Sequence, residues 1–219
     1  MTEAEKQYID LYTEASEAIK EHSAEVMNAV RDRAFEDFRR QGFPTRKVER
    51  YKYTDMEKIF APNYGLNINR IEFPVDPYAA FRCDVPNLST LLYFVVNDAF
   101  YTKRLPNVQS EEGVVIGSLR KAAEEHPELI ARYYARIAKT EEDAITALNT
   151  MLAQDGLFIY VPKNVQMEKC VQIINILRAD VSMMVNRRVL IVMEEGAKAK
   201  FLFCDHTADD HDFLATQVI

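Results

Sequence analysis

The chain has 219 residues, of which 48 % are apolar and 28 % charged, a composition typical of a folded globular protein with a sizeable core. Its 27 basic and 34 acidic residues leave a formal net charge of −7, which argues against nucleic acid as its main partner. No run approaches the roughly 18 apolar residues of a membrane span, and the acidic, helix-forming start is unlike a signal peptide. Three widely spaced cysteines, Cys83, Cys170 and Cys204, suit a reducing compartment, so we expect a cytoplasmic protein without membrane contact.

The first part of the chain, from about residue 2 to 41, has the period of amphipathic helices. Apolar residues recur at steps of three and four, at Tyr8, Leu11, Tyr12, Ala15 and Ile19, and again at Val26, Val30, Ala34 and Phe38. A break is expected at His22-Ser23, with Ser23 capping a second helix.

A mixed pattern with several prolines follows over residues 61–116. The run 91–96, the pair Asn97-Asp98 and the run 99–101 predict a strand, a turn and a second strand. Ser118 is predicted to begin a short helix that Pro127 ends, and 128–139 to form another.

Thr140 and Asp143 then have the spacing of a capping box for a helix over about 141–154, closed by Gly156. The period changes after Gly156. Short β-rich runs occupy 157–161, 171–177, 189–193, 199–204 and 213–219, with no amphipathic helix between them. On spacing alone a β-solenoid, a sandwich and a meander all remain open.

The segment 42–56, which joins the first helices to a further short one, has an uncommon residue order. Gly42 is placed as the residue that ends a helix, Pro44 prevents its continuation, and Thr54 with Glu57 has capping-box spacing. The segment resembles the N-terminal signature of the SufB/SufD family of iron–sulfur cluster assembly proteins, on the residues Gly42, Phe43, Pro44, Lys47, Glu49, Tyr51-Lys52-Tyr53 and Thr54.

Two later segments extend this resemblance over about residues 20–219. Ala147-Leu148-Asn149 with the run 155–162 is similar to the start of the family's core, and 187–192 with Glu195-Gly196-Ala197 is similar to its next recurring segment. The likeness is closer to SufD than to SufB. It implies an α+β fold, in which a mainly helical N-terminal domain with a small β element (1–154) precedes the first coils of a right-handed parallel β-helix (155–219).

The resemblance implies a non-enzymatic scaffold subunit of the Suf machinery, acting in a SufBCD complex with a SufB-like subunit and a SufC-like ATPase. The complex would assemble the iron–sulfur cluster, and no cofactor is expected on this chain. Two alternatives are a β-helix enzyme acting on polysaccharide and a general protein-interaction module. The enzyme would need aligned carboxylates, and no alignment is evident among Asp155, Glu168, Asp180, Glu194 and Glu195.

No residue is assigned a catalytic, cofactor-binding or metal-binding role from the sequence. Cys204-Asp205-His206 with His211 lacks the paired spacing of a metal site, and Cys83 and Cys170 have no second cysteine nearby. The six glycines form no phosphate-binding motif, and 209–212 is interpreted as a solvated loop. A charged group that could contact a partner or simply face solvent is formed by Lys47, Glu49, Arg50 and Lys52.

The chain stops within the β-rich run 213–219, whereas family members continue through further coils. We therefore expect a fragment of a longer protein. A solenoid needs a neighbour or a cap over its last apolar face, so this run predicts self-association, with a homodimer formed through the β-helix.

Overall fold

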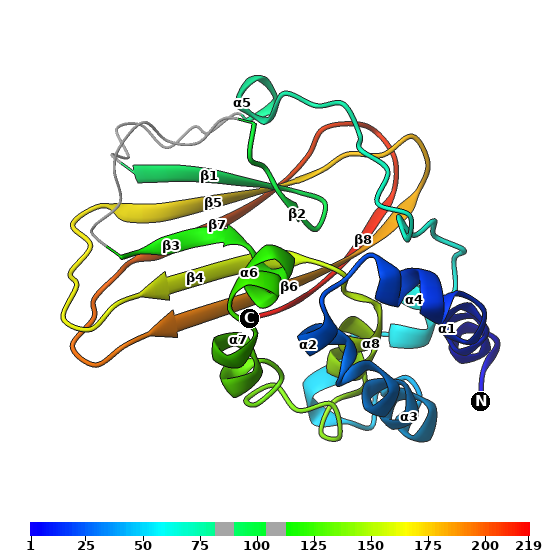
Figure 1. Cartoon of the computed structure of the whole chain (residues 1–219). Helices are drawn as coiled ribbons and strands as arrows, with labels where there is room; N and C mark the ends of the chain where they lie inside the picture. Colours follow the sequence, from blue (N-terminus) through cyan, green and yellow to red (C-terminus); the bar gives the residue numbers. More distant parts are fainter. Residues whose placement is uncertain (82–89, 104–112) are drawn as a thin grey trace.

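A computed structural model describes residues 1–81, 90–103 and 113–219, and shows a cluster of helices beside two sheets (Figure 1). The helices are α1 (Glu3–Glu21), α2 (Glu25–Asn28), α3 (Arg31–Gln41), the 3-10 turn η1 (Glu49–Tyr51), α4 (Met56–Phe60), α5 (Pro77–Ala80), α6 (Leu119–Glu125), α7 (Pro127–Tyr133) and α8 (Ala144–Leu152). None of these helices combines the length and apolar character needed to cross a membrane.

The strands form two four-stranded sheets, and from β4 onward successive strands alternate between them. They are β1 (Thr90–Val96), β2 (Ala99–Phe100), β3 (Val115–Ser118), β4 (Gly156–Val161), β5 (Cys170–Leu177), β6 (Met183–Met193), β7 (Phe201–Thr207) and β8 (Phe213–Val218). One sheet has the order β2-β1-β5-β7 and the other β3-β4-β6-β8. Pairing is parallel from β1 to β5 to β7 and from β4 to β6 to β8, while β2 and β3 pair antiparallel.

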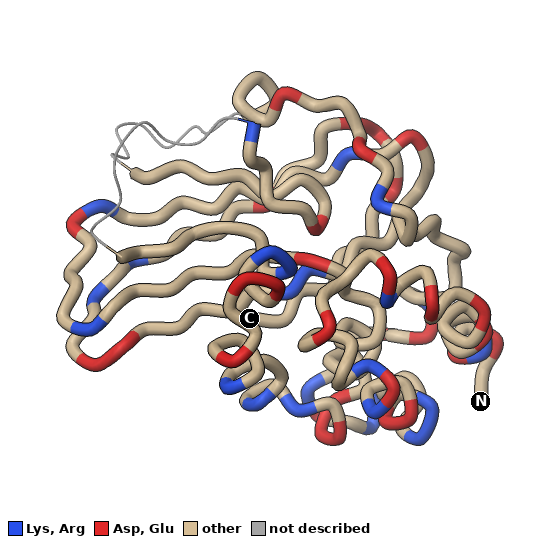
Figure 2. The backbone as a smooth tube through the Cα atoms, in the orientation of Figure 1, with Lys and Arg blue, Asp and Glu red and all other residues tan. Residues whose placement is uncertain are grey.

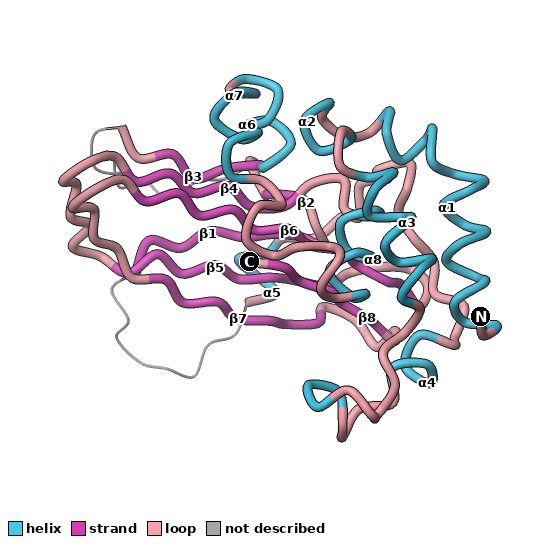
Figure 3. The backbone as a smooth tube through the Cα atoms, turned by 90° about the horizontal axis from the view of Figure 1, so that it is seen from below, coloured by secondary structure: helices cyan, strands magenta, loops and turns pink. Residues whose placement is uncertain are grey.

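The two sheets enclose an apolar core, and the view in Figure 3 shows them as stacked layers. Because side chains alternate along a strand, one face of each strand points between the sheets. Ile159, Val161, Ile173 and Val189 are among the side chains buried there. Helices α6 and α7 cover the outer face of β4 and β6, where Phe158 is buried with them.

A second core lies among α1, α3, α4 and α8. Phe43, from the segment after α3, packs edge to face on Tyr8 and Phe38 and stacks on Phe60, with the Phe43 and Phe60 ring centroids 4.7 Å apart. Asn149 joins this core to the sheets, because its side-chain amide donates to the Arg187 carbonyl at 3.0 Å and to Thr216 Oγ1 at 2.9 Å.

The predicted element types are largely confirmed, including the break at His22-Ser23, the strand–turn–strand over 91–101 and the five later strands. Three predicted caps are wrong, and two of the three hydroxyls, those of Ser23 and Thr140, bind other side chains instead. Ser23 Oγ accepts from Arg31 at 2.6 Å, and Thr140 Oγ1 donates to Asp37 at 2.6 Å, so Asp143 caps α8 alone. Asp55, not Thr54, caps α4, because its carboxylate accepts from the backbone of Lys58 at 3.1 Å.

Several boundaries also differ from the predictions. Helix α7 ends at Tyr133 rather than at 139, and Ala135 at φ 55 turns the chain away from helical geometry. Gly156 begins β4 instead of closing α8. Strand β6 begins at Met183, six residues before the predicted run at 189. The added part includes three polar residues, Asn186, Arg187 and Arg188, which are buried in the structure.

The fold is therefore a mixed α/β structure, as expected. The division into 1–154 and 155–219 stays a prediction. Strands β1, β2 and β3, which precede that boundary, belong to the same two sheets as the strands that follow it.

Candidate functional site

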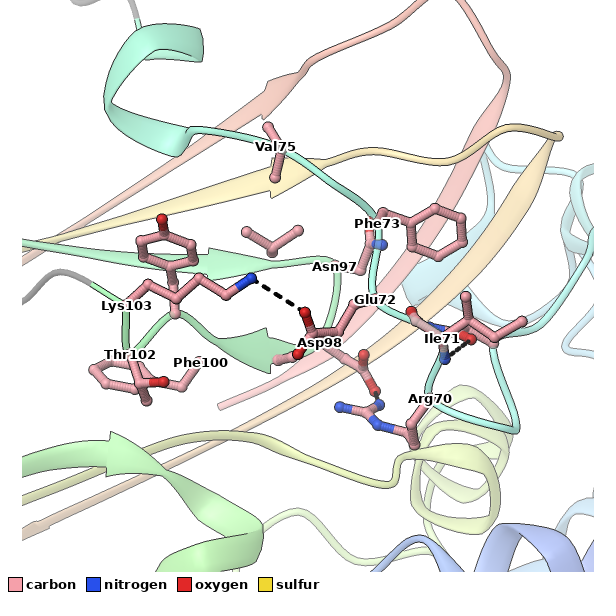
Figure 4. Close-up of a pocket in the computed structure, with 14 residues that line it drawn as sticks. Arg70, Ile71, Glu72, Phe73, Val75, Asn97, Asp98, Phe100, Thr102 and Lys103 are labelled. Carbon is pink, nitrogen blue, oxygen red and sulfur yellow. Dashed lines mark hydrogen bonds and ion pairs between the residues drawn. The ribbon is translucent and has the colours of Figure 1, made fainter.

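A pocket with a volume of about 150 Å³ lies between the β1–β2 hairpin and the segment 67–75 (Figure 4). The hairpin turn is Asn97-Asp98, and Asn97 adopts the left-handed φ of 56° that asparagine tolerates better than most residues. The Asn97 side chain donates to the Arg178 carbonyl at 2.8 Å and accepts from the Arg178 backbone at 3.0 Å. These bonds fix the turn and so place Asp98 at the pocket.

The opposite wall is shaped by a turn around Asn67. Its side-chain oxygen accepts from the Ile71 backbone and its amide donates to the Ile71 carbonyl, both at 2.8 Å. Arg70 within this turn has a φ of 55°. The turn directs the Arg70 side chain toward Asp98 rather than toward solvent (Figure 4), and this side chain is only 16 % exposed.

Arg70 pairs with two carboxylates, that of Asp98, which lines the pocket, and that of Asp155, which lies behind the lining. One guanidinium nitrogen binds Asp98 Oδ2, and the other lies 3.7 Å from Asp155 Oδ2. Burial on its own would lower the pKa of Arg70, but the charges of Asp98 and Asp155 outweigh it and raise that pKa above its ordinary value. Arg70 is therefore a permanent cation held between two acids.

Asp155 is the most deeply placed of the three. Its Oδ1 accepts from Ser118 Oγ at 2.8 Å, from the Arg120 backbone at 3.0 Å and from the Gly156 backbone at 2.7 Å. Burial raises the pKa of Asp155, while these donors and Arg70 act in the opposite direction by stabilising the carboxylate. The side chain thus joins the start of β4 to α6 and to the pocket.

The residues weighed as a metal site do not come together. Cys204 and His206 lie on the outer face of β7, where His206 packs edge to face on Phe81 at 5.4 Å. Asp205 on the opposite face accepts from Arg187 at 2.7 Å, and His211 lies 3.1 Å from Asp209. In the ranges that the structure describes, no three His, Cys, Asp or Glu side chains are grouped to hold a metal ion. Cys83 lies outside the described residues, and Cys170 and Cys204 are free thiols.

The acidic residues of the β half are also dispersed. Glu195 binds Lys163 at 2.6 Å, Asp180 binds Arg178 at 2.7 Å, and Asp155 faces Arg70. This arrangement differs from the row of carboxylates along one face that a polysaccharide-acting β-helix would need.

The signature segment 42–56 has a structural core and an exposed rim. Gly42 at φ 63 ends α3, and the Phe43 backbone donates to Glu5 at 2.9 Å. Tyr51 donates to Asp143 at 2.6 Å, and burial followed by this bond raises the pKa of Tyr51 to about 12. Arg50 also binds Asp143, at 3.0 Å, so this member of the predicted contact group has a structural role.

The other members of that group, Lys47, Glu49 and Lys52, are exposed. Of these three, Glu49 borders an open groove of about 470 Å³, which Arg50 also lines.

Sequence reasoning missed Arg70 and Asp98 and considered Asp155 only as one of several acids. Asn67 and Asn97 were the available signals, because asparagine favours turns and left-handed backbone. The spacing along the chain gives no indication that the two turns meet, since their approach depends on which strands pair.

Comparison with known proteins shows which family this chain resembles. The chain matches the family described as SufBD protein N-terminal region over residues 2–173. It is 29 % identical over 157 residues to the iron–sulfur cluster assembly protein SufD of Bacillus subtilis, covering 71 % of this chain and 35 % of that protein. It is 33 % identical over 97 residues to an iron–sulfur cluster assembly SufBD family protein of Synechocystis, covering 42 % of this chain and 19 % of the relative.

A chloroplastic SufBD family protein of Arabidopsis thaliana is 33 % identical over 94 residues, covering 42 % of this chain and 16 % of that protein. The fold places the chain in the class of mixed α/β proteins with parallel-paired strands. Within that class the chain belongs to the SufBD family, and both the family and the likeness to SufD expected from the sequence are confirmed. The chain spans about a third of the length of its Bacillus relative.

Proposed function

We propose that this chain is part of a SufD-like, non-enzymatic scaffold subunit that takes part in iron–sulfur cluster assembly. The observation that carries the proposal is the family match over residues 2–173, together with the relatives named as iron–sulfur cluster assembly proteins. In this proposal the cluster is the cargo of a larger complex, whose other members are a SufB-like subunit and a SufC-like ATPase.

The strand pairing supports a parallel β-helix as the core of this scaffold. From β4 onward each strand pairs in parallel with the strand two places later, and successive strands lie in opposite sheets. Such pairing is what the coils of a solenoid produce, and crossovers between parallel strands are overwhelmingly right-handed. We therefore propose the first coils of a right-handed β-helix. Its strands carry few charges, while acidic and basic residues are interspersed over the helices (Figure 2).

The test is deletion of the gene in its own organism, with return of the full-length protein. Iron–sulfur cluster content of the cell, measured by absorption and by iron and sulfide analysis, is expected to fall on deletion and to recover on return. A tagged protein is expected to co-purify with a SufB-like subunit. Unchanged cluster content and the absence of that subunit from the purified protein would refute the proposal.

We further propose that copies of this chain associate through β8. One edge of β8 pairs with β6, and Ile219 beyond it is 63 % exposed. Val218 and Ile219 border a hollow next to the loop after α7. An uncovered strand edge with apolar side chains favours pairing with another copy.

Analytical ultracentrifugation of the 219-residue chain is expected to show a dimer that weakens at least about tenfold in Val218→Lys, because a charge opposes edge pairing. Tyr53→Lys is the control, since Tyr53 is 91 % exposed and belongs neither to β8 nor to the hollow beside it. A monomer at high micromolar concentration, or equal weakening by both changes, would contradict self-association through this edge.

A further inference from the structure

The pocket between the β1–β2 hairpin and the segment 67–75 has walls and a floor of different chemistry. Apolar residues line it from both sides, Phe73 and Val75 from the segment 67–75 and Val96 and Phe100 from the hairpin. The volume of about 150 Å³ accommodates a short aliphatic group rather than a cofactor of nucleotide size.

The floor presents one carboxylate oxygen that the protein leaves without a partner. Asp98 Oδ2 binds Arg70, whereas no hydrogen bond reaches Asp98 Oδ1 from any residue in the described ranges. Asp98 is 15 % exposed and lines the pocket, so a ligand inside the pocket meets its carboxylate. An acceptor in such a place is suited to a donor carried by a ligand.

The charge of the floor favours a cation over an anion. Two carboxylates, Asp98 and Asp155, flank the guanidinium of Arg70, and the Oδ1 atom of Asp155 is occupied by three donors of the protein. A second guanidinium near Asp98, that of Arg187, has its own carboxylate partner in Asp205 at 2.7 Å. An anion would approach Arg70 only beside both acids. A cation would meet the free oxygen of Asp98.

The mouth of the pocket adds a second acid. Glu72 binds Lys103 at 3.1 Å across the opening, and both side chains are largely exposed, at 83 % and 68 %. Exposed ion pairs of this kind are weak, so the pair can open without a large penalty. Glu72 is then available to attract the charged group of a cation as it enters.

From these observations we propose that the pocket binds an ammonium or guanidinium group on a short aliphatic stem. The stem packs between Phe73, Val75 and Phe100, and the cation donates to Asp98 Oδ1. The source is either a free small amine or guanidine, or a lysine or arginine side chain of a partner protein, which presents the same chemistry.

The proposal is tested by saturation-transfer NMR and titration with n-butylguanidinium and n-butylammonium. The expected dissociation constant is on the order of millimolar, because so small a ligand offers few contacts. Two controls of similar shape, the neutral 1-pentanol and the anionic pentanoate, are expected to bind at least about tenfold more weakly, since a charged hydrogen bond is lost. The capped peptide acetyl-Gly-Arg-Gly-amide tests the second source, and binding of only one probe type identifies which source fits.

Variants locate the site. Asp98→Asn removes the charge at constant shape and is expected to weaken binding of n-butylguanidinium at least about tenfold. Val75→Phe fills the pocket without touching the ion pair and is expected to abolish binding, which keeps the test decisive if Asp98→Asn does not fold. Asp212→Asn, a carboxylate change in the loop before β8, is the matched control and is expected to change binding less than about twofold. Absence of saturable binding up to 20 mM (about twentyfold above the expected constant), equal binding of pentanoate, or unchanged binding in Val75→Phe would overturn the proposal.

Discussion

Replacing Gly156 with alanine is expected to destabilise the protein by about 3 kcal/mol or more, the range of severe overpacking against backbone. Gly156 is the first residue of β4 and lies opposite Arg188 of β6. A Cβ on Gly156 would lie 1.8 Å from the Arg188 carbonyl oxygen and 2.9 Å from the Arg188 nitrogen. Both atoms are backbone of a paired strand, so no side chain can turn away and the strands would have to separate.

The measurement is the urea midpoint of unfolding, followed by circular dichroism, for Gly156→Ala beside Gly117→Ala. Gly117 lies in β3, pairs with Phe158 of β4, and has open space within 4 Å of an added Cβ. Its substitution is expected to change the free energy of unfolding by no more than about 0.5 kcal/mol. Similar midpoints for the two variants would show that the close approach of β4 and β6 does not limit stability.

Gly156 shows which features of the fold local sequence patterns predict and which they miss. Local patterns predicted that 157–161 is a strand and that Asn97-Asp98 is a turn, because alternation and turn propensity are properties of adjacent residues. The same patterns placed Gly156 at the end of a helix. The structure requires glycine at this position because the backbone of Arg188 leaves no room for a Cβ. Arg188 is distant in sequence and becomes a neighbour only through parallel pairing.

The misplaced caps have a related cause. A serine or threonine near a helix start is a good cap by its own chemistry, but the same hydroxyl can serve a partner elsewhere in the chain. Thr140 donates to Asp37 of α3, and Ser23 accepts from Arg31. Asp143 and Asp55 then supply the caps, so local reasoning placed the helices correctly and chose the wrong residue.

The pocket was the least predictable feature. Arg70, Asp98 and Asp155 come from three separate segments, and each is an ordinary charged residue in the sequence. Charged residues are expected at the surface, which is also why the polar start of β6 was not predicted as strand. What brings the three together is the placement of the hairpin against 67–75, a consequence of sheet topology.

Replacing Arg31 with methionine is expected to destabilise the protein by about 3 to 5 kcal/mol, because several buried acceptors lose their donor and each such loss costs about 1 to 3 kcal/mol. Arg31 is 0 % exposed at the start of α3. It donates to the carbonyls of Thr150 and Met151 at 3.3 and 3.0 Å, to Asn28 at 2.8 Å and to Ser23 at 2.6 Å. Methionine fills similar space but leaves these acceptors without their donor.

The position of the Arg31 charge also contributes to stability. Thr150 and Met151 lie in the last turn of α8, where carbonyl groups carry the negative end of the helix dipole and favour a cation. Burial lowers the pKa of the Arg31 guanidinium, which means that lost hydration offsets part of the gain from these contacts. Arg31→Lys retains the charge with fewer donors, so a loss between that of methionine and the wild type is expected, about 1 to 3 kcal/mol.

The control is Arg39→Met on the same helix. Arg39 is 56 % exposed, binds the exposed Glu36 at 2.6 Å and lies over the Phe35 ring, 5.8 Å from its centroid. Exposed contacts of these two kinds each contribute up to about 1 kcal/mol. Thermal and urea unfolding of the three variants should therefore rank Arg31→Met well below Arg31→Lys, with Arg39→Met near the wild type. Equal stability of the two methionine variants would mean that the last turn of α8 finds other donors, and that α3 and α8 are held together by their apolar contacts alone.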